Sequence, residues 1–306
     1  MNGGWPEFVR GVQPGGGFAV RVMAWVGRWR RGWLRRFRPR YVAAMAALRD
    51  GACPGCPHDV VDGRDVVWVQ NVCGIRFPPP HRVSPFRDRF GLVRLGRPEL
   101  LLATCVGAVV IATALATVPM LALSGALPPL FAAWFFRDPE RCAPASSQAL
   151  LAPADGVLDD VRREASCPFF AGPAWRLGIY LSVFDVHVQR APIAGRVVAG
   201  DYRRGRCVPT KRRGHTDANE QANTTFVDDH GTPVTVRQLA GPFASRIVTV
   251  VRVGDVVRAG DRFGLIKFGS RCELFVPVDR VAELRVVVGT RVRAGESVLA
   301  EFVRQP

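Results

Sequence analysis

The chain has 306 residues, of which 48% are hydrophobic, so it is long and apolar enough to build a packed core in one or two domains. Its formal charge is +16, from 42 basic and 26 acidic residues, and all but two of the basic residues are arginines. This balance excludes an acidic, solvating chain and leaves nucleic acid or an anionic membrane surface as candidate partners.

Residues 1–80 have the composition of a basic extension, because Gly, Pro and Arg clusters alternate there with short apolar stretches. A basic helix is predicted from Val20 to Phe37, ahead of Pro39. It would carry Trp25, Trp29, Trp33 and Phe37 at four-residue spacing, which suits a membrane interface. The alternative, which we adopt as the expectation for residues 1–80, is a poorly ordered extension. No apolar stretch with a small-residue cleavage site opens the chain, so we expect no signal peptide.

The eight cysteines are irregularly spaced, and in a chain of this length they do not predict a disulfide framework. Cys53 and Cys56, with His58 and Cys73 nearby, have the spacing of half a zinc knuckle. The second ligand pair is incomplete, and we therefore expect no metal site.

The segment 81–141 is expected to anchor the chain in a membrane. Its central part, Leu100–Phe136, contains no charged residue and is longer than the roughly 20 residues of a single span. Pro119 divides this part, which favours a hairpin of two short helices. Arginines flank it on both sides and place both ends on the cytoplasmic side. A buried helix pair of a soluble protein is the less favoured alternative.

Residues 142–306 consist of short β-type runs between glycine turns, which predicts an all-β domain. The stretch VGDVVRAGD from Val253 returns as VGTRVRAGE from Val288, an offset of 35 residues. A looser pair, around Gly156 and Gly195, is offset by 39 residues. Such turn-then-strand units resemble the barrel-sandwich hybrid of biotinyl and lipoyl domains and predict a quasi-symmetric β core.

Three residues of this domain could carry chemistry together. Ser270 is a candidate nucleophile, His187 a candidate base and Asp155 a candidate orienting carboxylate. Each also has a plain structural explanation, as a bulge, a satisfied histidine and an Asp-Gly turn. A GxSxG elbow is missing around Ser270, which disfavours an ordinary serine hydrolase. The step Gly269-Ser270 interrupts a strand-like run, where glycine weakens the strand.

Several motifs in a fixed order resemble the phosphatidylserine decarboxylases of the short, bacterial type: FFRDPER, PADGV, SVFDVHVQRAP, NEQAN and RFGLIKFGSRCELFVP. The resemblance runs from about residue 80 to the C-terminus. It implies a carboxy-lyase of phospholipid biosynthesis, made as a zymogen that cuts itself autocatalytically between Gly269 and Ser270. The products are a β chain of residues 1–269 and an α chain of 37 residues.

The same resemblance implies the cofactor, a pyruvoyl group made from Ser270, without a metal or pyridoxal phosphate. Its ketone forms a Schiff base with the amine of phosphatidylserine, and loss of CO2 then leads to phosphatidylethanolamine. His187 is the expected proton donor and the base of self-cleavage, and Asp155 is expected to orient it.

Substrate-binding residues follow from the resemblance less directly. Longer members of the family carry a second histidine where this chain has Arg190, which we expect to bind the carboxylate or phosphate of the substrate. Asn219, Glu220 and Asn223 match a family segment and are expected near the substrate. A bacterial inner membrane, a catalytic domain on its cytoplasmic face and a dimer or larger assembly are further implications.

Two rival functions come from other classes. A biotinyl- or lipoyl-like membrane adaptor or carrier would share the hairpin repeats, but carriers present a lysine at the hairpin tip and both repeats offer only arginine. Nucleic-acid binding through the arginine-rich N-terminal part lacks a recognised module, and we expect no nucleic-acid partner.

Overall fold

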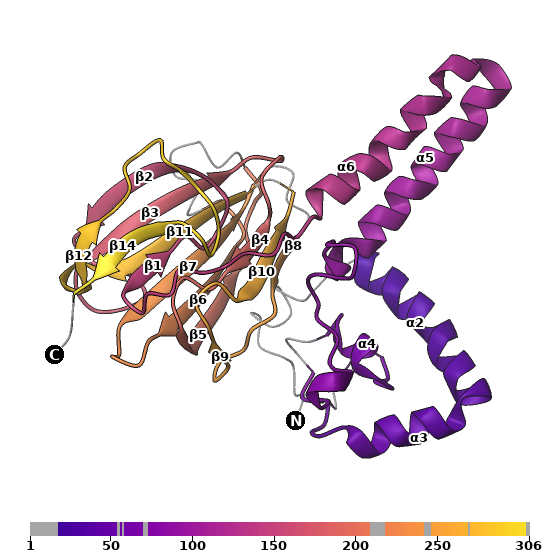
Figure 1. Ribbon diagram of the computed structural model, residues 1–306, viewed down its shortest axis with the longest axis horizontal. Helices are drawn as coiled ribbons and strands as arrows, with labels where there is room; N and C mark the ends of the chain where they lie inside the picture. The colour runs from indigo at the N-terminus through magenta and orange to yellow at the C-terminus, as the bar shows by residue number, and fades with distance from the viewer. Residues whose placement is uncertain are drawn as a thin grey trace. The chain divides into compact units, whose positions relative to one another are not determined.

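The computed structural model describes residues 18–53, 56, 58–69, 73–208, 218–241, 246–268 and 270–303, and only the backbone of residues 18–21, 246 and 270. The chain divides into two compact units, one within residues 14–139 and the other mainly within residues 140–306. Figure 1 draws the first in indigo to magenta and the second in rose to yellow. The two units are described separately.

The first unit is helical. Its elements are α2 (Phe18–Phe37), α3 (Pro39–Leu48), α4 (Gly63–Val66), the 3-10 helices η1 (Pro79–His81) and η2 (Arg94–Gly96), α5 (Arg97–Thr117), the 3-10 helix η3 (Pro119–Ala126) and α6 (Leu127–Phe135). Helix α2 covers the candidate basic helix, so its residues form a helix and not the poorly ordered extension that we expected for residues 1–80. It ends before Pro39, which opens α3 because a proline is tolerated only in the first turn of a helix.

Ion pairs attach α2 to the segment around α4. Arg30 donates to the Asp62 carboxylate over 2.7 Å, and the buried Arg31 donates to Asp65 over 3.0 Å. Asp62 also caps α4 by accepting a 2.9 Å hydrogen bond from the backbone of Arg64. These arginines are therefore part of an ordered helical unit.

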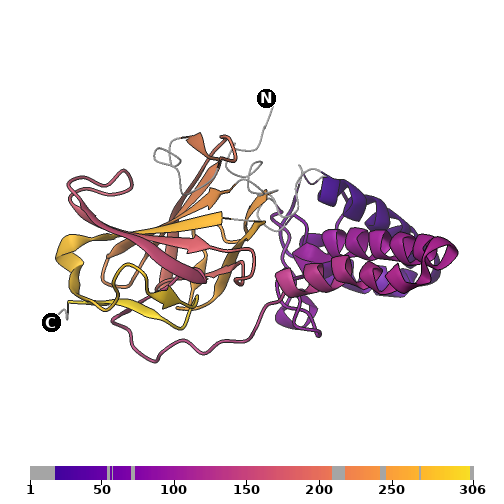
Figure 2. The same cartoon turned by 90° about the horizontal axis from the view of Figure 1, so that it is seen from above.

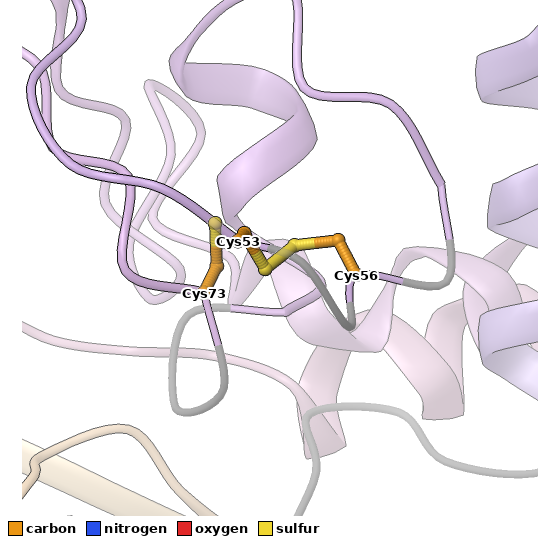
Figure 3. A group of neighbouring side chains, drawn as sticks. All are labelled: Cys53, Cys56 and Cys73. Carbon is orange, nitrogen blue, oxygen red and sulfur yellow. A yellow bond between two sulfur atoms is a disulfide. The ribbon is translucent and has the colours of Figure 1, made fainter. Parts of the chain in front are cut away.

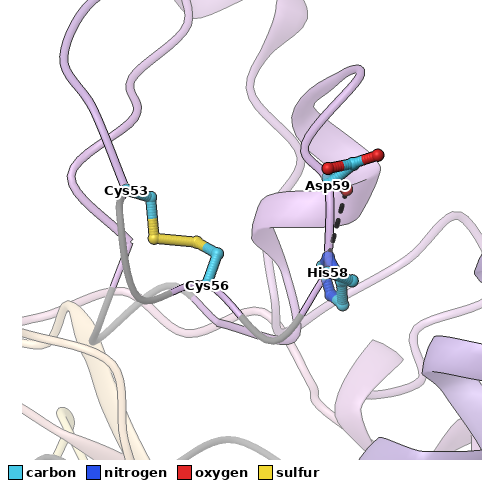
Figure 4. The surroundings of a disulfide bond; sticks show 4 residues. All are labelled: Cys53, Cys56, His58 and Asp59. Carbon is cyan, nitrogen blue, oxygen red and sulfur yellow. Dashed lines mark hydrogen bonds between the residues drawn. A yellow bond between two sulfur atoms is a disulfide. The ribbon is translucent and has the colours of Figure 1, made fainter.

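Cys53 and Cys56 form a disulfide, a pairing that the sequence did not predict (Figure 4). The two residues are three positions apart, and their Cα atoms are separated by 5.4 Å, within the range that a disulfide needs. This is one local bridge in an irregular segment, and it does not make a disulfide framework.

Helix α5 and the apolar segment formed by η3 and α6 run antiparallel and pack along their length (Figure 1). Gly107 and Gly125 allow the close approach, because a Cβ on Gly107 would lie 2.3 Å from the carbonyl oxygen of Gly125. At the base, the backbone N–H of Val93 donates to Phe136 over 2.8 Å. The two ends of the apolar segment therefore lie at the same end of the helix pair.

The second unit is mainly β, as predicted. Its strands are β1 (Ala149–Leu151), β2 (Gly156–Glu164), β3 (Ala174–Leu181), β4 (Val188–Arg190), β5 (Gly195–Arg203), β6 (Gln221–Val227), β7 (Pro233–Ala240), β8 (Arg246–Thr249), β9 (Val256–Val257), β10 (Arg262–Lys267), β11 (Ser270–Pro277), β12 (Val281–Leu284), β13 (Arg291–Val292) and β14 (Val298–Phe302), with the 3-10 helix η4 (Val278–Arg280).

One curled, antiparallel sheet of eight strands dominates this unit, in the order β13-β2-β3-β11-β7-β6-β5-β9 (Figures 1 and 2). Two three-stranded sheets, β4-β10-β8 and β1-β14-β12, complete it. The main apolar core includes Phe226 and Phe263, which are fully buried with ring centroids 5.3 Å apart. Such an edge-to-face pair fixes both rings in the core.

The repeats seen in the sequence occupy equivalent places in this unit. The backbone N–H of Gly254 donates to Val197, and that of Gly289 donates to Leu158, each over 2.7 Å. The donors differ by 35 residues and the acceptors by 39, which are the two offsets of the sequence repeats. Both glycines have a positive φ, near 96°, that other residues rarely adopt. The two repeats therefore make equivalent backbone hydrogen bonds to β5 and β2.

Candidate active site

Ser270 opens β11, one of the two central strands of the large sheet. Its backbone is paired with Leu181 at the end of β3 and with Ala240 at the end of β7. Gly269, the other half of the expected cleavage site, lies outside the described residues, as does the Ser270 side chain. Phe268, the residue before Gly269, has a φ of +64°. Among the described residues, it is the only one other than glycine with a positive φ.

His187 lies beside this turn because of the strand register. Strand β3 ends at Leu181, opposite Ser270, and the chain then passes through the loop 182–186 to His187. The following residue, Val188, pairs with Leu265 on β10, the strand that leads into Ser270. The loop before His187 leads from β3 to β4, and the segment before Ser270 leads from β10 to β11. Strand β3 pairs with β11 and β4 pairs with β10, so the two connections run between the same two sheets. The structure thus brings these two predicted residues into one region.

The imidazole of His187 is buried, with 1% of the residue exposed. Its Nδ1 atom lies 2.9 Å from the backbone carbonyl oxygen of Asp185. Because a carbonyl oxygen only accepts, Nδ1 carries the proton, and Nε2 is the basic nitrogen of the neutral ring. Asp185 is fixed in turn, since its carboxylate accepts hydrogen bonds from the Ser182 backbone and from Arg291.

Asp155 is tied to the chain around it. Its carboxylate accepts two hydrogen bonds from Arg141, one of them 2.7 Å long, and a third from the backbone N–H of Ala294 over 2.8 Å. The side chains of Asp155 and Arg141 are 12% and 6% exposed, so this is a buried ion pair. Removing either partner would leave an uncompensated buried charge.

Arg190 lies close to the loop that contains Asp155. Its backbone N–H donates to Pro153 over 2.9 Å, and its guanidinium donates to the carbonyl oxygen of Gly260 over 3.0 Å. A Cβ on Gly295 would lie 2.8 Å from the Arg190 side chain, so the two equivalent glycines 260 and 295 both border it. Arg190 is 4% exposed and ties β4 to the two repeated turns.

Asn219 and Glu220 lie beside the strand partner of Ser270. The Asn219 side chain donates to the carbonyl oxygen of Ala240 over 2.7 Å, and the backbone N–H of Ala240 donates to Glu220 over 2.9 Å. Among the described residues, the Glu220 carboxylate has one buried oxygen without a hydrogen-bond partner. The segment that the sequence placed near the substrate thus holds the end of β7.

Asn223 belongs to a different face of the sheet. It donates to Asp201 over 2.8 Å and accepts from Arg237 over 3.2 Å. Arg237 lies opposite Glu273 on β11, whereas Cys272 alternates to the other face and joins the apolar core. Asn223 is therefore part of a charged network behind β11 rather than of the region of Asn219 and Glu220.

Sequence reasoning missed that network. Arg271 directly follows Ser270, is 4% exposed and donates to Asp159 over 2.5 Å and to the fully buried Glu273 over 3.2 Å. Glu273 also accepts from Arg237 over 3.3 Å, and burial lowers the pKa of Arg237. The sequence signal was the spacing of Arg271 and Glu273, which are two positions apart in an otherwise apolar strand and therefore share one face of it.

A second missed feature is a chain of buried polar side chains between β4, β7 and β8. Thr249 donates to Gln238, and Gln238 donates to Gln189, each over 2.8 Å. Gln238 lies two residues before Ala240 on β7 and shares its face of the strand, and Gln189 lies on β4, two residues after His187. All three residues of the chain are fully buried. They connect β4, which begins directly after His187, with β7, which pairs with Ser270.

Residues 129–300 match the sequence model of the family described as phosphatidylserine decarboxylase. A relative from Rhodopirellula baltica, named phosphatidylserine decarboxylase proenzyme, is 40% identical over 223 residues, which cover 72% of this chain and 92% of the relative. Relatives of the same name from Saccharopolyspora erythraea and Symbiobacterium thermophilum are 41% and 42% identical over 56% of this chain, and over 73% and 80% of their own lengths.

Proposed function

We infer that this chain, which belongs to the phosphatidylserine decarboxylase family, is the proenzyme of a carboxy-lyase that converts phosphatidylserine to phosphatidylethanolamine and CO2. The match to a relative along nine-tenths of that relative's length carries this conclusion. The proenzyme name of the relatives implies self-processing into two chains. The substrate is a phospholipid, so the reaction belongs to phospholipid biosynthesis.

The bond that is cut is proposed to be Gly269–Ser270, with the Ser270 hydroxyl as the nucleophile. Phe268 supports this placement, because a residue other than glycine at φ +64° stores about 1–3 kcal/mol of backbone strain. Phe268 lies directly before Gly269, between β10, which is paired with β8, and β11, which is paired with β3. After cleavage, the 37-residue α chain would stay in place through the pairing of β11 with β3 and β7.

A pyruvoyl group formed from Ser270 would supply the ketone that accepts the electron pair released with CO2. The position fits such a group, because the residue that would bear it is held on both sides by Leu181 and Ala240. Rigid strands hold a reacting atom more precisely than loops do. Neither a metal nor pyridoxal phosphate has a part in this proposal.

His187 is proposed to move the proton, with Nε2 as the acting nitrogen. The bond from Nδ1 to the Asp185 carbonyl holds the ring and selects this tautomer. The same nitrogen would take the Ser270 proton during self-cleavage and later return a proton to the substrate carbon.

Asp155 is proposed as a positioning residue for His187. Its carboxylate binds Arg141 and the backbone of Ala294 and so fixes the loop 153–155. The carbonyl oxygen of Pro153 in that loop accepts a hydrogen bond from the backbone N–H of Arg190, the last residue of β4. Asp155 would thus act on His187 through β4. Its loss should change the rate and the pH profile of the reaction together.

The substrate-binding roles are proposals as well. Arg190 offers a guanidinium to the carboxylate or phosphate of the lipid, and the buried Glu220 oxygen offers a partner to its ammonium group. Asn219 and Asn223 would support this region indirectly, since their side chains hold Ala240 and Arg237.

Attachment to a membrane is proposed through the helical unit. The segment Arg94–Thr117 is apolar and long enough to cross a bilayer, which by itself is a weak indication. Trp25, Trp29 and Trp33 are exposed along α2. A cavity of about 480 Å³ in the same unit is lined by six arginines, Arg30, Arg31, Arg64, Arg89, Arg94 and Arg97, and by two carboxylates, Asp65 and Asp88. Arg30, Arg31 and Arg97 form ion pairs with aspartates, and the remaining excess of positive charge suits an anionic lipid headgroup.

The finer assignments belong to the same proposal. They are the inner membrane of a bacterium, a catalytic domain on its cytoplasmic face and a dimer or larger assembly. They also include a barrel-sandwich hybrid fold and three regions, 1–80, 81–141 and 142–306. The equivalent turns at Gly254 and Gly289 support the fold assignment.

The activity is tested by incubating the purified full-length protein with vesicles that contain phosphatidylserine labelled in the carboxyl group. We expect release of labelled CO2 and formation of phosphatidylethanolamine, both lost after treatment with a carbonyl reagent and in Ser270→Ala. An intact phosphatidylserine pool with fully cleaved protein would contradict the activity, and an uncut chain would favour the adaptor or carrier reading.

A further inference from the structure

Three cysteines meet at one point of the helical unit. Cys53 and Cys56 belong to the segment after α3, and Cys73 follows α4, 17 residues beyond Cys56 in the sequence. Their sulfur atoms all lie within 4.8 Å of one another (Figure 3). Cys73 is fully buried, and the other two are half-buried. The incomplete ligand set noted in the sequence thus gains a third sulfur from a distant segment.

A backbone ladder builds this point. Asp50 and Arg76 exchange two hydrogen bonds, of 2.9 and 2.7 Å, as an antiparallel bridge. Next to it, a Cβ on Gly51 would lie 2.4 Å from the carbonyl oxygen of Gly74, so only glycine permits the close approach. Gly74 directly follows Cys73, and Gly51 lies two residues before Cys53. The ladder therefore fixes the distance between the cysteine segments independently of any bond between sulfurs.

We propose that Cys53, Cys56 and Cys73, in their reduced form, bind one Zn²⁺ ion in the helical unit. Thiolates bind Zn²⁺ at about 2.3 Å, which puts the sulfurs of a tetrahedral site about 3.8 Å apart. The Cys73 sulfur lies within 4.8 Å of both other sulfurs, so opening the Cys53–Cys56 bond would let all three reach this spacing with small side-chain movements. A disulfide uses only two of the three sulfurs, whereas a soft cation uses them all.

The fourth position of the tetrahedron is assigned to a water molecule. His58 is the histidine closest to Cys56 in the sequence, but its Nδ1 atom contacts the carbonyl oxygen of Asp59 over 3.2 Å (Figure 4). It is not one of the ligand atoms in the three-sulfur group. Three thiolates and a water complete four-coordinate zinc.

The disulfide between Cys53 and Cys56 is then the oxidised, metal-free form. A dithiol reductant would supply two electrons and two protons to open it and would itself become a disulfide. Zn²⁺ binding to the three thiols would release three protons. Gly96 and Phe136, at the two ends of the apolar helix pair, lie against each other. A membrane entered by this pair would therefore have both flanking segments of the pair on one face, and the cytoplasmic face is a reducing compartment that keeps thiols reduced.

The test measures metal content and not activity, so it stands apart from the proposed function. The full-length protein is purified with a dithiol reductant, equilibrated with Zn²⁺ and freed of excess metal. We expect one zinc per chain in the wild type, in Ser270→Ala and in Cys142→Ser, whose cysteine is exposed and unpaired by disulfide. We expect its loss in Cys73→Ser.

Co²⁺ provides a readout that does not depend on any variant. Added to the reduced wild-type protein, it should give the intense thiolate-to-metal charge-transfer absorption of a sulfur-rich tetrahedral site, which Zn²⁺ then removes. Three titratable thiols without bound zinc or this absorption would overturn the proposal. So would a Cys53–Cys56 disulfide that persists in the reductant.

Discussion

The two units of this chain differ in how much of their apolar side chains is exposed. In residues 140–306 large apolar side chains such as Phe226 and Phe263 are fully buried in one core, with Phe184, at 64% exposed, an exception. In residues 14–139 many stay exposed, among them Trp29 at 71%, Leu123 at 85% and Met120 at 90%. Burial of apolar surface stabilises a fold in water, so the β unit is stable by its own core. The helical unit is suited to contact with another apolar phase.

The largest expected effect separates catalysis from attachment. His187→Gln should lower decarboxylation by a factor of about 10²–10⁴, because the proton would lose its positioned carrier. Membrane binding should be unchanged, since His187 lies in the β unit. Labelled CO2 release and vesicle co-sedimentation measure the two properties. A variant with nearly wild-type turnover would contradict the role of His187.

Core packing gives the next largest contrast. Phe263→Ala should lower the free energy of unfolding of the β unit by about 3–5 kcal/mol, because it leaves a cavity against Phe226. The control, Trp29→Ala in the helical unit, should change it by no more than about 0.5 kcal/mol. Urea denaturation of the full-length protein in detergent measures both. Equal losses would mean that the two units share one core.

Membrane attachment provides a matched pair of exposed valines. Val109 on α5 is 66% exposed and Val256 on β9 is 70% exposed. Val109→Arg should weaken membrane association by about 2.5–3.5 kcal/mol, the cost of a charge at the centre of a spanning helix. Val256→Arg should leave it unchanged. Flotation with vesicles measures the bound fraction, and equal behaviour of the two variants would show that α5 does not enter the bilayer.

Local patterns predicted much of this fold. The repeats at Val253 and Val288 encode turns with fixed hydrogen bonds, so these turns were found from the sequence. The basic run ending at Phe37 was recognised as a possible helix, but we expected poor order there because the ion pairs that hold it come from a distant segment. The partner of a buried charge is not encoded locally. Arg141 pairs with Asp155 through the tertiary fold, and the meeting of Cys73 with Cys53 depends on a ladder between distant segments.

The candidate site was predicted to a similar extent. The order of motifs indicated His187 and Ser270, and strand register places their segments together. Strand alternation places Arg271 on the same face of β11 as Glu273, but whether that face is buried depends on the side chains of other segments that cover it. Sequence alone could not count the carboxylates around Arg271.

The smallest expected effect concerns pH. Burial alone would raise the pKa of Asp160, but hydrogen bonds from Arg176 and Arg162 outweigh it and hold the pKa below its ordinary 3.8. The ionised form therefore stabilises the folded state above about pH 4, and this contribution is lost as pH falls through the folded-state pKa. Asp160→Asn should remove it, within about 1 kcal/mol because Arg162 is exposed. Unfolding curves between pH 3 and 7 that stay parallel for both proteins would contradict this assignment.

The most direct test of the central claim is the intact mass of the purified full-length protein. Self-processing predicts two species, a β chain that ends at Gly269 and a 37-residue α chain with a blocked, carbonyl-reactive N-terminus. In Ser270→Ala only the uncut chain of 33.5 kDa should be found. A wild-type protein that remains a single chain of that mass after incubation with lipid would contradict the account.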